Sequence, residues 1–467
     1  MKKYIIMTMV ALAAFTGCKD FLEEAPILDQ SDKLTLATLE GLDKATAGAY
    51  SPLASTSWYG ADFILINELK TSNGKKFIGS SYDSGRCNDM YNNNYNENST
   101  SGLWSYGYYV ISAVNNVIDN LEDKGDEQDL NNLKAECLFL RALSHFDLVR
   151  TYAQPYCYTS DASHDGVPVV LHTEPDAKPA RESVANVYKQ VVEDLLEAEK
   201  IIDPDYVRAG TDKRSFVSLY AIQALLSRVY LYMENWQGAA NYASKVINSG
   251  KYAMWTPADL ENSKCYTVDV PAGGEVIFEV YGGKNNSYDG YHDGLSPMTG
   301  PNGYGDAGCS ADLIGLYEDE DVRGGLFQQD GAVTWTSKYK GKGFSRPDVN
   351  NTIVLRLSEM YLNLAEAVAN GATGYNGVEA LEIIAANRNA TAQPCTKAGV
   401  YLERQKELAW EAHLWFDLGR TKRDVTRVDF VGAESSRNLE WGSYKWAMPI
   451  PLREYGVNPN LTHNPGY

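Results

Sequence analysis

Two carboxylates near the C-terminus, Glu407 and Asp417, have the residue types and spacing most suggestive of chemistry. A pair of carboxyl groups that flanks a glycosidic bond can act as general acid and as nucleophile or base. Helical spacing, however, directs the neighbouring Leu408 and Trp415 into a core, where glutamate and arginine side chains are retained as ion pairs. We therefore predict that Glu407, Asp417 and Arg420 form buried or half-buried ion pairs and take no part in acid–base chemistry.

Other catalytic constellations are missing from the sequence. The histidines are scattered and form no His-Glu-x-x-His zinc motif, and the chain has neither a Gly-x-Ser-x-Gly motif nor a phosphate-binding loop. The acidic runs at 122–126 and 318–321 could offer oxygen ligands to calcium, but they match no EF-hand spacing, and we interpret them as solvated loops. We expect no catalytic residue, no cofactor and no metal ion.

Two loop regions, within residues 52–102 and 256–350, combine aromatic rings with amide and charged side chains. A flat ring covers the apolar CH face of a sugar, while Asn, Asp and Arg side chains bind the surrounding hydroxyls. Any single ring can equally serve loop packing, but clustered rings and amides favour a bound ligand. We predict a site between the two regions, made from Trp58, Tyr82, Arg86, Asn88, Tyr91, Asn92, Tyr95, Tyr288, Tyr291 and Tyr304. The expected stacking rings are Tyr91, Tyr95, Tyr288 and Tyr291, and Trp335 is a further ring of the second loop.

The N-terminus has the pattern of a secretory signal. Lys2 and Lys3 precede an apolar run at 4–15, and small residues precede Cys18. The run is shorter than the ~20 residues that a membrane-spanning helix needs. We predict a lipoprotein signal peptide at 1–17 and acylation of the Cys18 thiol, and more than one acyl chain would hold the protein stably at a membrane. The alternative is an ordinary signal peptide that happens to contain a cysteine.

Composition narrows the range of partners. The 467 residues contain 42 Lys and Arg against 61 Asp and Glu, for a net charge of −19. Nucleic acid and anionic lipid headgroups require a cationic surface and are therefore not expected as partners. Tyrosine is abundant, with 32 residues against 12 phenylalanines, and rings with a polar tip suit wet recognition surfaces. The other six cysteines show no metal-binding spacing, and Cys137 is expected to be a small core residue.

Helical spacing of apolar residues over most of the chain predicts a mainly α fold with a few short strands. We expect helices at 34–51, 103–121, 130–152, 183–202, 215–233, 236–249, 353–370, 377–389 and 400–418. Residues 276–281 are strand-like, and irregular loops dominate 52–102 and 256–350.

An internal repeat indicates that several helices are paired. The motif Leu-Ser-x-x-Tyr-Leu occurs at 226–231 and again at 357–362, with a weaker copy at 143–148. A small residue followed by a tyrosine and an alanine-rich second helix resembles the tetratricopeptide repeat. The copies are degenerate and widely spaced, so we predict paired helices without a regular solenoid.

Several sequence blocks together resemble the SusD/RagB family of outer-membrane lipoproteins, which capture nutrients for TonB-dependent transporters. The blocks are the Cys-Lys-Asp-Phe-Leu start at 18–22, Lys-Ala-Glu-Cys-Leu-Phe-Leu-Arg-Ala-Leu at 134–143, Phe-Asp-Leu-Val-Arg at 146–150, Gly-Val-Pro-Val-Val at 166–170, Trp-Phe-Asp-Leu-Gly-Arg at 415–420, and the tail Asn-Pro-Asn-Leu-Thr-His-Asn-Pro-Gly-Tyr at 458–467. They span the whole chain.

The resemblance implies one SusD-like domain over 18–467, with a helical scaffold at about 103–255 and 353–424 and ligand-binding inserts at about 52–102 and 256–350. It implies binding without catalysis, a lipid anchor in the outer membrane at the cell surface, and a SusC-like TonB-dependent transporter as partner. The ring-and-amide loops favour an oligosaccharide ligand. A peptide ligand, as in the RagB branch, is the alternative, and the missing catalytic set disfavours a surface-anchored hydrolase.

Overall fold

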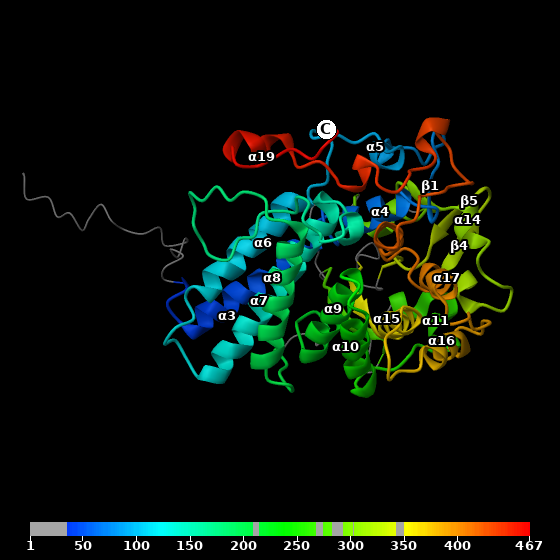
Figure 1. Ribbon diagram of the computed structural model, residues 1–467. Helices are drawn as coiled ribbons and strands as arrows, with labels where there is room; N and C mark the ends of the chain where they lie inside the picture. Colours follow the sequence, from blue (N-terminus) through cyan, green and yellow to red (C-terminus); the bar gives the residue numbers. More distant parts are fainter. Residues whose placement is uncertain (1–34, 209–213, 268–273, 283–292, 302, 342–349) are drawn as a thin grey trace, which may run out of the picture.

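Helices dominate the part of the chain that the computed structural model describes, residues 35–208, 214–267, 274–282, 293–301, 303–341 and 350–467 (Figure 1). The helices are α3 (Leu39–Gly48), α4 (Asp62–Leu69), α5 (Asn88–Tyr91), α6 (Leu103–Ile118), α7 (Glu127–Tyr152), α8 (Val184–Ile201), α9 (Leu219–Tyr232), α10 (Trp236–Asn248), α11 (Pro257–Leu260), α12 (Lys264–Thr267), α13 (Leu295–Met298), α14 (Ala311–Ile314), α15 (Leu357–Ala369), α16 (Gly377–Ala386), α17 (Lys397–Glu407), α18 (Leu414–Arg420) and α19 (Leu452–Val457). The strands are β1 (Gly74–Lys76), β2 (Val276–Val280), β3 (Ala307–Cys309), β4 (Phe327–Asp330), β5 (Val333–Thr336) and β6 (Thr352–Arg356). The mainly α fold predicted from the sequence is confirmed.

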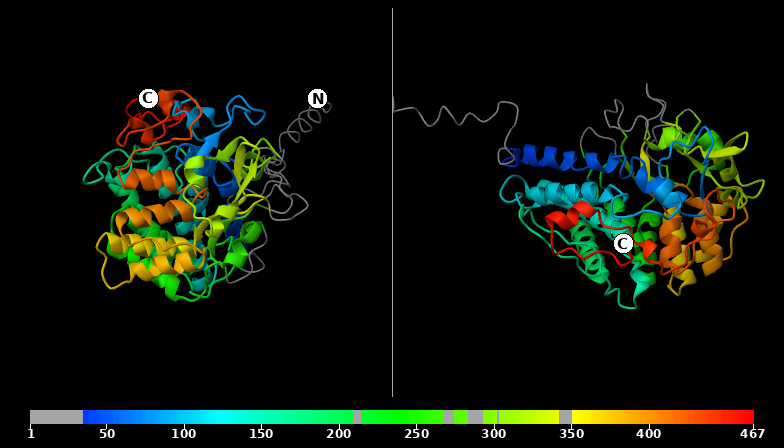
Figure 2. Two further views of the ribbon diagram at one scale, coloured as in Figure 1. Left: turned by 90° about the vertical axis from the view of Figure 1, so that its right-hand side faces the viewer. Right: turned by 90° about the horizontal axis from the view of Figure 1, so that it is seen from above.

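The long helices form one continuous array. Helices α6 to α10 pack against one another in chain order, and α15 to α17 extend the array through a contact between α10 and α15. The left view of Figure 2 shows this array on one side of the molecule and the short strands and loops on the other. The scaffold is therefore continuous in space although the second loop region interrupts it in sequence.

Close packing at the repeated serine confirms the predicted helix pairs. Ser227 of α9 is fully buried, and its hydroxyl donates to the carbonyl oxygen of Ala239 on α10 at 2.9 Å. The Ser227 hydroxyl oxygen also accepts a hydrogen bond from the side-chain amide of Asn363 on α15 at 3.2 Å. A small side chain thus allows three helices to meet at one point, and the polar atoms left there are paired.

Helix α7 is the central helix of the scaffold and is buried on nearly all sides from Ala135 onward. Its N-terminus is capped by Asp126, whose carboxylate accepts from the backbone N–H of Gln128 at 2.9 Å. Its buried charges are paired, as Arg141 shows with two hydrogen bonds of 2.8 and 2.7 Å to Asp194 of α8. Such pairing removes much of the cost of placing charge in a core.

Short strands join the two loop regions. β1 of the first region pairs antiparallel with β3 of the second, with Gly74 opposite Cys309 and Lys76 opposite Ala307. β4 and β5 form an antiparallel hairpin, and β3 lies against β5. The pairing places the loop that follows β1 beside the segment that precedes β3.

The helix predicted at 353–370 starts later than expected, because its first residues form β6. β6 pairs antiparallel with β2, which confirms the strand expected at 276–281. The segment Thr352-Ile353-Val354 is β-branched and therefore suits a pleated, buried position. The strand partner, which lies far away in sequence, overrides the helical spacing, and α15 begins only at Leu357.

The single helix predicted at 400–418 is also wrong, because α17 and α18 are separated by a sharp turn. Trp410 and Ala412 have φ angles of 63° and 60°, which end an α-helix. Tertiary contacts hold the turn, since Tyr339 donates to the Trp410 carbonyl oxygen at 2.5 Å and the Ala412 N–H donates to Glu68 at 2.8 Å. The turn directs Glu411 into the protein interior.

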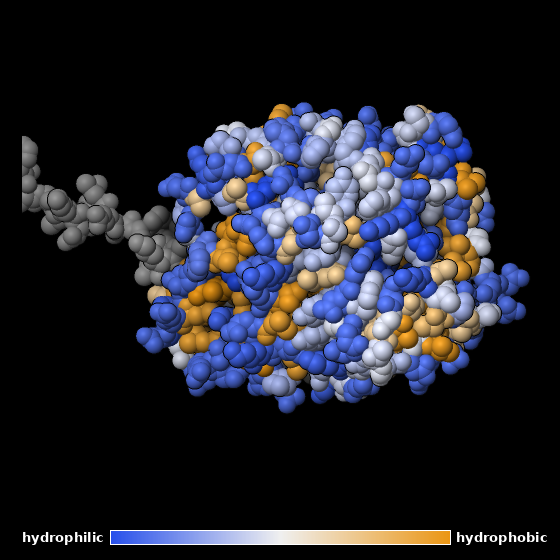
Figure 3. Space-filling model, viewed as in Figure 1, coloured by the Kyte–Doolittle hydropathy of each residue, from blue (hydrophilic) through white to orange (hydrophobic). Residues whose placement is uncertain are grey.

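The surface, the helix lengths and the N-terminal segment bear on the predicted association with a membrane. The face in Figure 3 is mostly polar, with apolar side chains in separate patches, in keeping with a chain of net charge −19. None of the helices in the described ranges is long and apolar enough to cross a membrane. The signal segment 1–17 and Cys18 lie outside these ranges, so acylation of Cys18 stays a prediction.

Candidate functional site

The carboxylates Glu407 and Asp417 are held in buried ion pairs, as the sequence predicted. Glu407 accepts hydrogen bonds from Arg323, Arg356 and Arg388 at 2.9, 2.7 and 2.7 Å. Burial opposes ionisation of Glu407, but the three guanidinium charges outweigh it and hold its pKa well below the usual range. A carboxylate fixed in this way stays ionised and is poorly suited to donate or accept a proton.

Asp417 is neutralised in the same manner. It accepts from Arg404 at 2.9 Å and from Arg420 at 2.7 Å. Burial raises the pKa of Asp417, but the charges of these two arginines bring it below its ordinary value. The sequence therefore identified the charged cluster correctly as a structural element.

The same network fastens the second loop region to the scaffold. Arg356, at the end of β6, bonds to Glu275 at 2.9 Å and to Glu411 at 2.7 Å. Arg388 reaches Glu275 at 2.6 Å, and Lys338 pairs with Glu411 at 2.5 Å. These pairs connect β6 and the segment after β5 to the α17–α18 turn, and they hold the region that carries the candidate site.

Aromatic rings from the two loop regions meet next to the β1–β3 pair. The Tyr82 ring lies edge-on to the Trp335 ring, with centroids 5.0 Å apart, and Phe77 contacts both rings at 6.4 and 6.1 Å. Trp335 is buried beneath the half-buried Tyr82. Gly305 is required here, because it has a φ of +60° and a Cβ atom would lie 2.8 Å from the Tyr82 ring.

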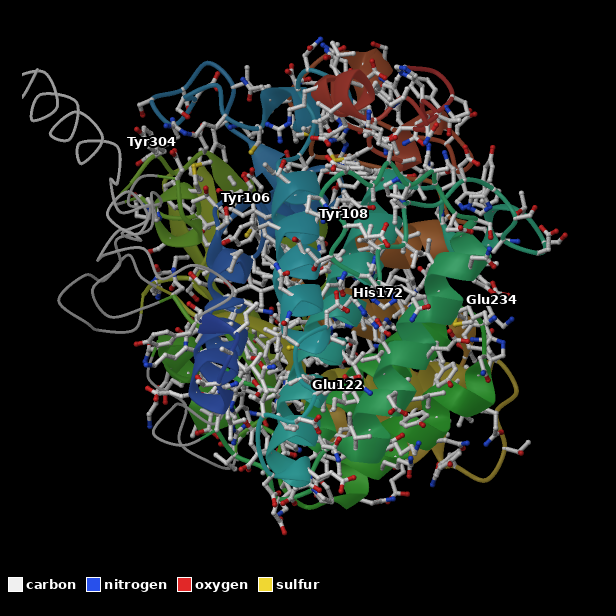
Figure 4. All side chains as sticks on the ribbon, turned by 90° about the vertical axis from the view of Figure 1, so that its left-hand side faces the viewer. Tyr106, Tyr108, Glu122, His172, Glu234 and Tyr304 are labelled. Atoms are coloured by element: carbon white, nitrogen blue, oxygen red, sulfur yellow. The ribbon has the colours of Figure 1, made fainter. Side chains whose placement is uncertain are left out.

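Arg86 and Tyr304 form the polar part of this cluster. The Arg86 guanidinium lies 3.9 Å from the centroid of the Tyr304 ring. Its Nε donates to Asp293 at 2.6 Å, and its Nη1 donates to Ser84 at 3.0 Å. The side chains of Arg86 and Asp293 are 35% and 47% exposed. Figure 4 shows Tyr304 at the edge of the molecule. We call Tyr82, Arg86, Asp293 and Tyr304 the aromatic rim.

A buried ion pair fixes the loop that carries the rim. Lys76, the last residue of β1, donates to Asp306 at 2.9 Å and to the Arg86 carbonyl oxygen at 2.7 Å. Asp306 also accepts from the Ser84 N–H at 2.8 Å. Both ends of the loop from Lys76 to Arg86 are thus tied to one charged pair, which preorganises the rim before a ligand arrives.

The predicted amides Asn88 and Asn92 lie close to the rim loop. Asn88 starts α5 and donates to Asp83 at 3.4 Å, while Asn92 donates to the Asn88 carbonyl oxygen at 2.9 Å. The side-chain oxygen of Asn88 is buried and has no hydrogen-bond partner among the residues that the structure describes. An acceptor in this state favours an added donor from water or ligand.

Three predicted ligand contacts, Trp58, Tyr91 and Tyr95, lie in the core. Trp58 is fully buried and donates from its indole nitrogen to Asp147 at 2.8 Å. Tyr91 is also fully buried and stacks on Phe430 with centroids 4.8 Å apart. Tyr95 is 3% exposed, and its hydroxyl donates to the Lys445 carbonyl oxygen. A ring without exposed surface cannot stack on a ligand, so the structure argues against these three contacts.

Tyr288 and Tyr291 lie outside the described residues, and their stacking role stays a prediction. Asp293 follows that segment closely and belongs to the rim through its bond to Arg86. Phe77, Asp293 and the Lys76–Asp306 pair were not predicted from the sequence. No local pattern points to the Lys76–Asp306 pair, because its partners are 230 positions apart.

The acidic runs considered for calcium have structural roles instead. Asp126 caps α7. Asp321 pairs with Arg323 at 2.8 Å and with Lys406 at 2.9 Å. No group of metal-binding side chains occurs within the described ranges. The cysteines there are free, and Cys137 is fully buried, as expected for a core residue.

Comparison with known families gives matches in both the N-terminal and the C-terminal parts of the chain. One family model, described as "Starch-binding associating with outer membrane", matches residues 20–231, and a second, "SusD family", matches residues 327–467. SusD-like protein P2 of Formosa agariphila is 26% identical over 100% of both chains.

Solved structures share the fold over nearly the whole chain. A SusD superfamily protein from Bacteroides vulgatus has a TM-score of 0.82 and 28% identity, covering 92% of this chain and 99% of that one. Surface glycan-binding protein A from Bacteroides fluxus has a TM-score of 0.75 and 20% identity, covering 92% of this chain and 100% of its own, and shows similarity of fold.

Proposed function

The chain belongs to the SusD family, and on this premise we propose that it captures oligosaccharide at the outer cell surface and delivers it to a SusC-like TonB-dependent transporter. The family model that matches residues 20–231 is described as starch-binding and associated with the outer membrane. Beyond membership of the family, we propose where the ligand binds, that the protein does not catalyse a reaction, that a lipid anchors it, and that its partner is the transporter.

The aromatic rim is the observation that supports sugar binding most directly. Tyr82 and Tyr304 offer half-buried rings, and Arg86 and Asp293 add charged donors and acceptors beside them. Pyranose rings need an apolar surface for their CH face and hydrogen bonds for their hydroxyls, and the rim supplies both. The partial exposure of Arg86 and Asp293 leaves room for a chain to continue past the site.

A structural neighbour supports sugar over peptide as the ligand. The Bacteroides fluxus protein with the same fold is named for surface glycan binding. Peptide capture more often uses an unpaired sheet edge, which supplies backbone hydrogen bonds. The rim instead presents aromatic rings and charged side chains.

The state of the conspicuous carboxylates supports the proposal of binding without catalysis. Glu407 and Asp417 are buried, ionised and bonded to several arginines, so neither is available to a sugar at the surface. The rim carboxylate Asp293 is bound to Arg86.

Isothermal titration calorimetry of the mature protein tests the rim. The probes are starch and laminarin oligosaccharides, host glycans and a mixed peptide library. Replacing Tyr82 and Tyr304 together with Ala should weaken glycan binding by about tenfold or more, since each buried aromatic contact contributes roughly 1–2 kcal/mol. Tyr109→Ala is the matched control, because Tyr109 is 63% exposed on α6, outside both loop regions.

Two outcomes would overturn the proposed ligand site. Unchanged glycan affinity in the Tyr82/Tyr304 variant, with native circular dichroism, would place binding elsewhere. Binding to the peptide library and to none of the glycans would establish the peptide alternative instead.

Cell fractionation tests the lipid anchor. Cys18→Ala should remove the protein from the outer-membrane fraction, because acylation requires the thiol and acyl chains provide the affinity for the membrane. Cys395→Ala controls for loss of a cysteine elsewhere, at a half-buried free thiol. An unchanged membrane fraction for Cys18→Ala would contradict the lipoprotein prediction.

Affinity purification tests the transporter partner. Gentle detergent extraction with a tag on this chain should recover a TonB-dependent transporter in near-equal amount. Recovery of this chain alone in several detergents would contradict a stable complex.

A further inference from the structure

A cavity of about 190 Å³ lies in the helical scaffold. It is lined by residues of the α9–α10 turn, the end of α15, helix α17, the end of α18 and the segment after α18. Glu234, which lines it, and Tyr304 of the rim lie at opposite edges of the molecule in Figure 4. The cavity is therefore separate from the aromatic rim.

The cavity is cationic although the protein is strongly acidic. Five cationic and two anionic side chains line it, in a chain of net charge −19. Lys397, Lys422 and Arg423 are the outer three of the cations, and within the described residues no carboxylate oxygen lies within 4.0 Å of their side-chain nitrogens. Unpaired cations around a concavity attract and retain an anion.

The inner charges of the cavity are already balanced. Arg404 bonds to Asp417 at 2.9 Å and to Asn363 at 2.8 Å. Arg420 bonds to Glu366 at 2.5 and 2.8 Å. These pairs give the cavity a rigid polar floor, so the positive charge available to a ligand comes from the three outer residues and is offset in part by the exposed carboxylate of Glu234.

Aromatic side chains give the cavity an apolar wall. Tyr401 and Trp236 both line it and are half-buried. The Arg423 guanidinium stacks on Tyr401 at 3.9 Å from the ring centroid, which fixes the position of that charge. No other ring or cation is stacked on Trp236 in the described part of the chain, so its indole remains available for a ligand.

The size of the cavity limits the ligand to a small molecule. Pockets for drug-sized ligands measure about 300–1,000 Å³, and this cavity is smaller. One sugar-sized ring with a charged substituent combines a face for Trp236 with an anion for Lys397, Lys422 and Arg423. A bare inorganic anion would leave the indole unused.

We propose that this cavity binds a single sugar ring that carries a carboxylate or sulfate group. The site is independent of the rim and adds recognition of an acidic sugar to the proposed capture of oligosaccharide. The charged group lies between the three outer cations, and the ring stacks on Trp236.

Calorimetry of the mature protein with four probes tests the assignment. Sodium glucuronate and glucose 6-sulfate should bind, glucose should not, and inorganic sulfate should bind more weakly than glucuronate. The variant Lys397→Gln/Lys422→Gln/Arg423→Gln should lose about tenfold or more in glucuronate affinity, because charge-assisted hydrogen bonds are lost. The control Lys44→Gln/Lys189→Gln/Lys200→Gln removes the same charge at side chains that are 70%, 71% and 75% exposed, and should bind as the wild type does.

Two further variants make two distinctions. The first separates the contribution of the Trp236 ring from that of the charges, and the second separates binding in this cavity from binding at the rim. Trp236→Ala should weaken glucuronate binding while leaving the affinity for inorganic sulfate unchanged. The Tyr82/Tyr304 double alanine variant should retain full glucuronate affinity, so failure of the rim proposal would leave this test intact.

Any one of four results would overturn the proposal. These are equal affinity for glucose and glucuronate, unchanged affinity in the triple glutamine variant, equal loss in the control triple, and no binding of any probe. Equal affinity for inorganic sulfate and glucuronate would overturn the part that assigns a sugar ring.

Discussion

The buried network around Glu407 and the exposed pair of Arg86 and Asp293 are built from the same residue types but have different surroundings. Glu407 is bonded to three arginines and is 3% exposed, whereas Asp293 meets one arginine and its side chain is 47% exposed. Breaking a buried pair leaves an uncompensated charge at a cost of about 3–5 kcal/mol, while an exposed pair contributes about 0–1 kcal/mol. Burial and the number of partners, more than residue type, separate the scaffold from the candidate site.

Two buried glutamates extend this comparison. Glu407 is surrounded by arginines, and its pKa is held well below the usual range. Glu68 of α4 is fully buried too, but it is bonded to Asn73 and to the Ala412 N–H, both neutral, at 2.8 Å. Burial raises the pKa of Glu68 to about 7. The folded protein thus contains one glutamate that stabilises it when ionised and another that stabilises it when protonated.

The largest expected effect is on the buried network. Glu407→Gln should lower the free energy of unfolding by about 3–5 kcal/mol at pH 7, because three arginines lose their shared carboxylate. Since the folded pKa is depressed, this stabilisation is present above the ordinary glutamate pKa of 4.5 and is lost as the pH falls toward the folded value. Urea unfolding at several pH values measures the difference.

Glu434→Gln is the control for that experiment. Glu434 pairs with Arg437 at 2.9 Å, but its side chain is 76% exposed, so the change should be within about 0.5 kcal/mol. Equal stability losses for the two variants would remove the distinction between buried and exposed pairs.

Glu68→Gln should give the opposite pH dependence, at a somewhat smaller magnitude. Because the folded pKa of about 7 exceeds the unfolded value of 4.5, wild-type stability is greatest below pH 4.5 and falls as the pH rises through 7. The wild type should therefore lose about 2–3 kcal/mol relative to the Gln variant between pH 5 and pH 8. A parallel pair of stability–pH curves would contradict the raised pKa.

Arg86→Ala should affect binding rather than folding. Loss of a charged donor beside the Tyr304 ring should weaken glycan affinity by roughly tenfold, while the unfolding free energy changes by no more than about 1 kcal/mol. Arg453→Ala is the matched control, since Arg453 is 68% exposed and pairs with Glu454 away from the rim. Equal calorimetric affinities for the two variants would remove Arg86 from the site.

The smallest expected effect is on the rim carboxylate. Asp293→Asn should change stability by about 0–1 kcal/mol, as for other exposed ion pairs. Asp194→Asn replaces a carboxylate that also faces one arginine, but its side chain is 3% exposed, and the loss should be several-fold larger. Thermal unfolding of both variants measures the two losses of stability. Similar losses would show that burial does not determine the cost of losing a carboxylate.

The sequence predicted the helices well where local spacing determines them. Apolar spacing locates α8 within the predicted range 183–202 and α9 within 215–233, and the Leu-Ser-x-x-Tyr-Leu motif locates two helix pairs. The errors at β6 and at the α17–α18 turn have one cause. In both places a partner distant in sequence, β2 or Glu68, decides the backbone conformation.

The candidate site was predictable as a region more than as a set of residues. Tyr82, Arg86 and Tyr304 come together from the two predicted loops. Trp58 and Tyr95 lie in sequence that is equally rich in rings and amides. Yet the Trp58 indole nitrogen bonds to Asp147, 89 positions away, and the Tyr95 hydroxyl bonds to the Lys445 carbonyl oxygen, 350 positions away. Composition identifies loops rich in rings, whereas only the fold shows which rings face solvent.

The pairing of β1 with β3 also sets the order in which the protein can mature. The scaffold helices α6 to α10 make contacts with neighbours in sequence and can form early. The rim loop cannot be fixed until Asp306 reaches Lys76, across 230 positions. The rim is therefore among the last parts of the protein to assemble, and a partly synthesised chain would have a scaffold before it has a rim.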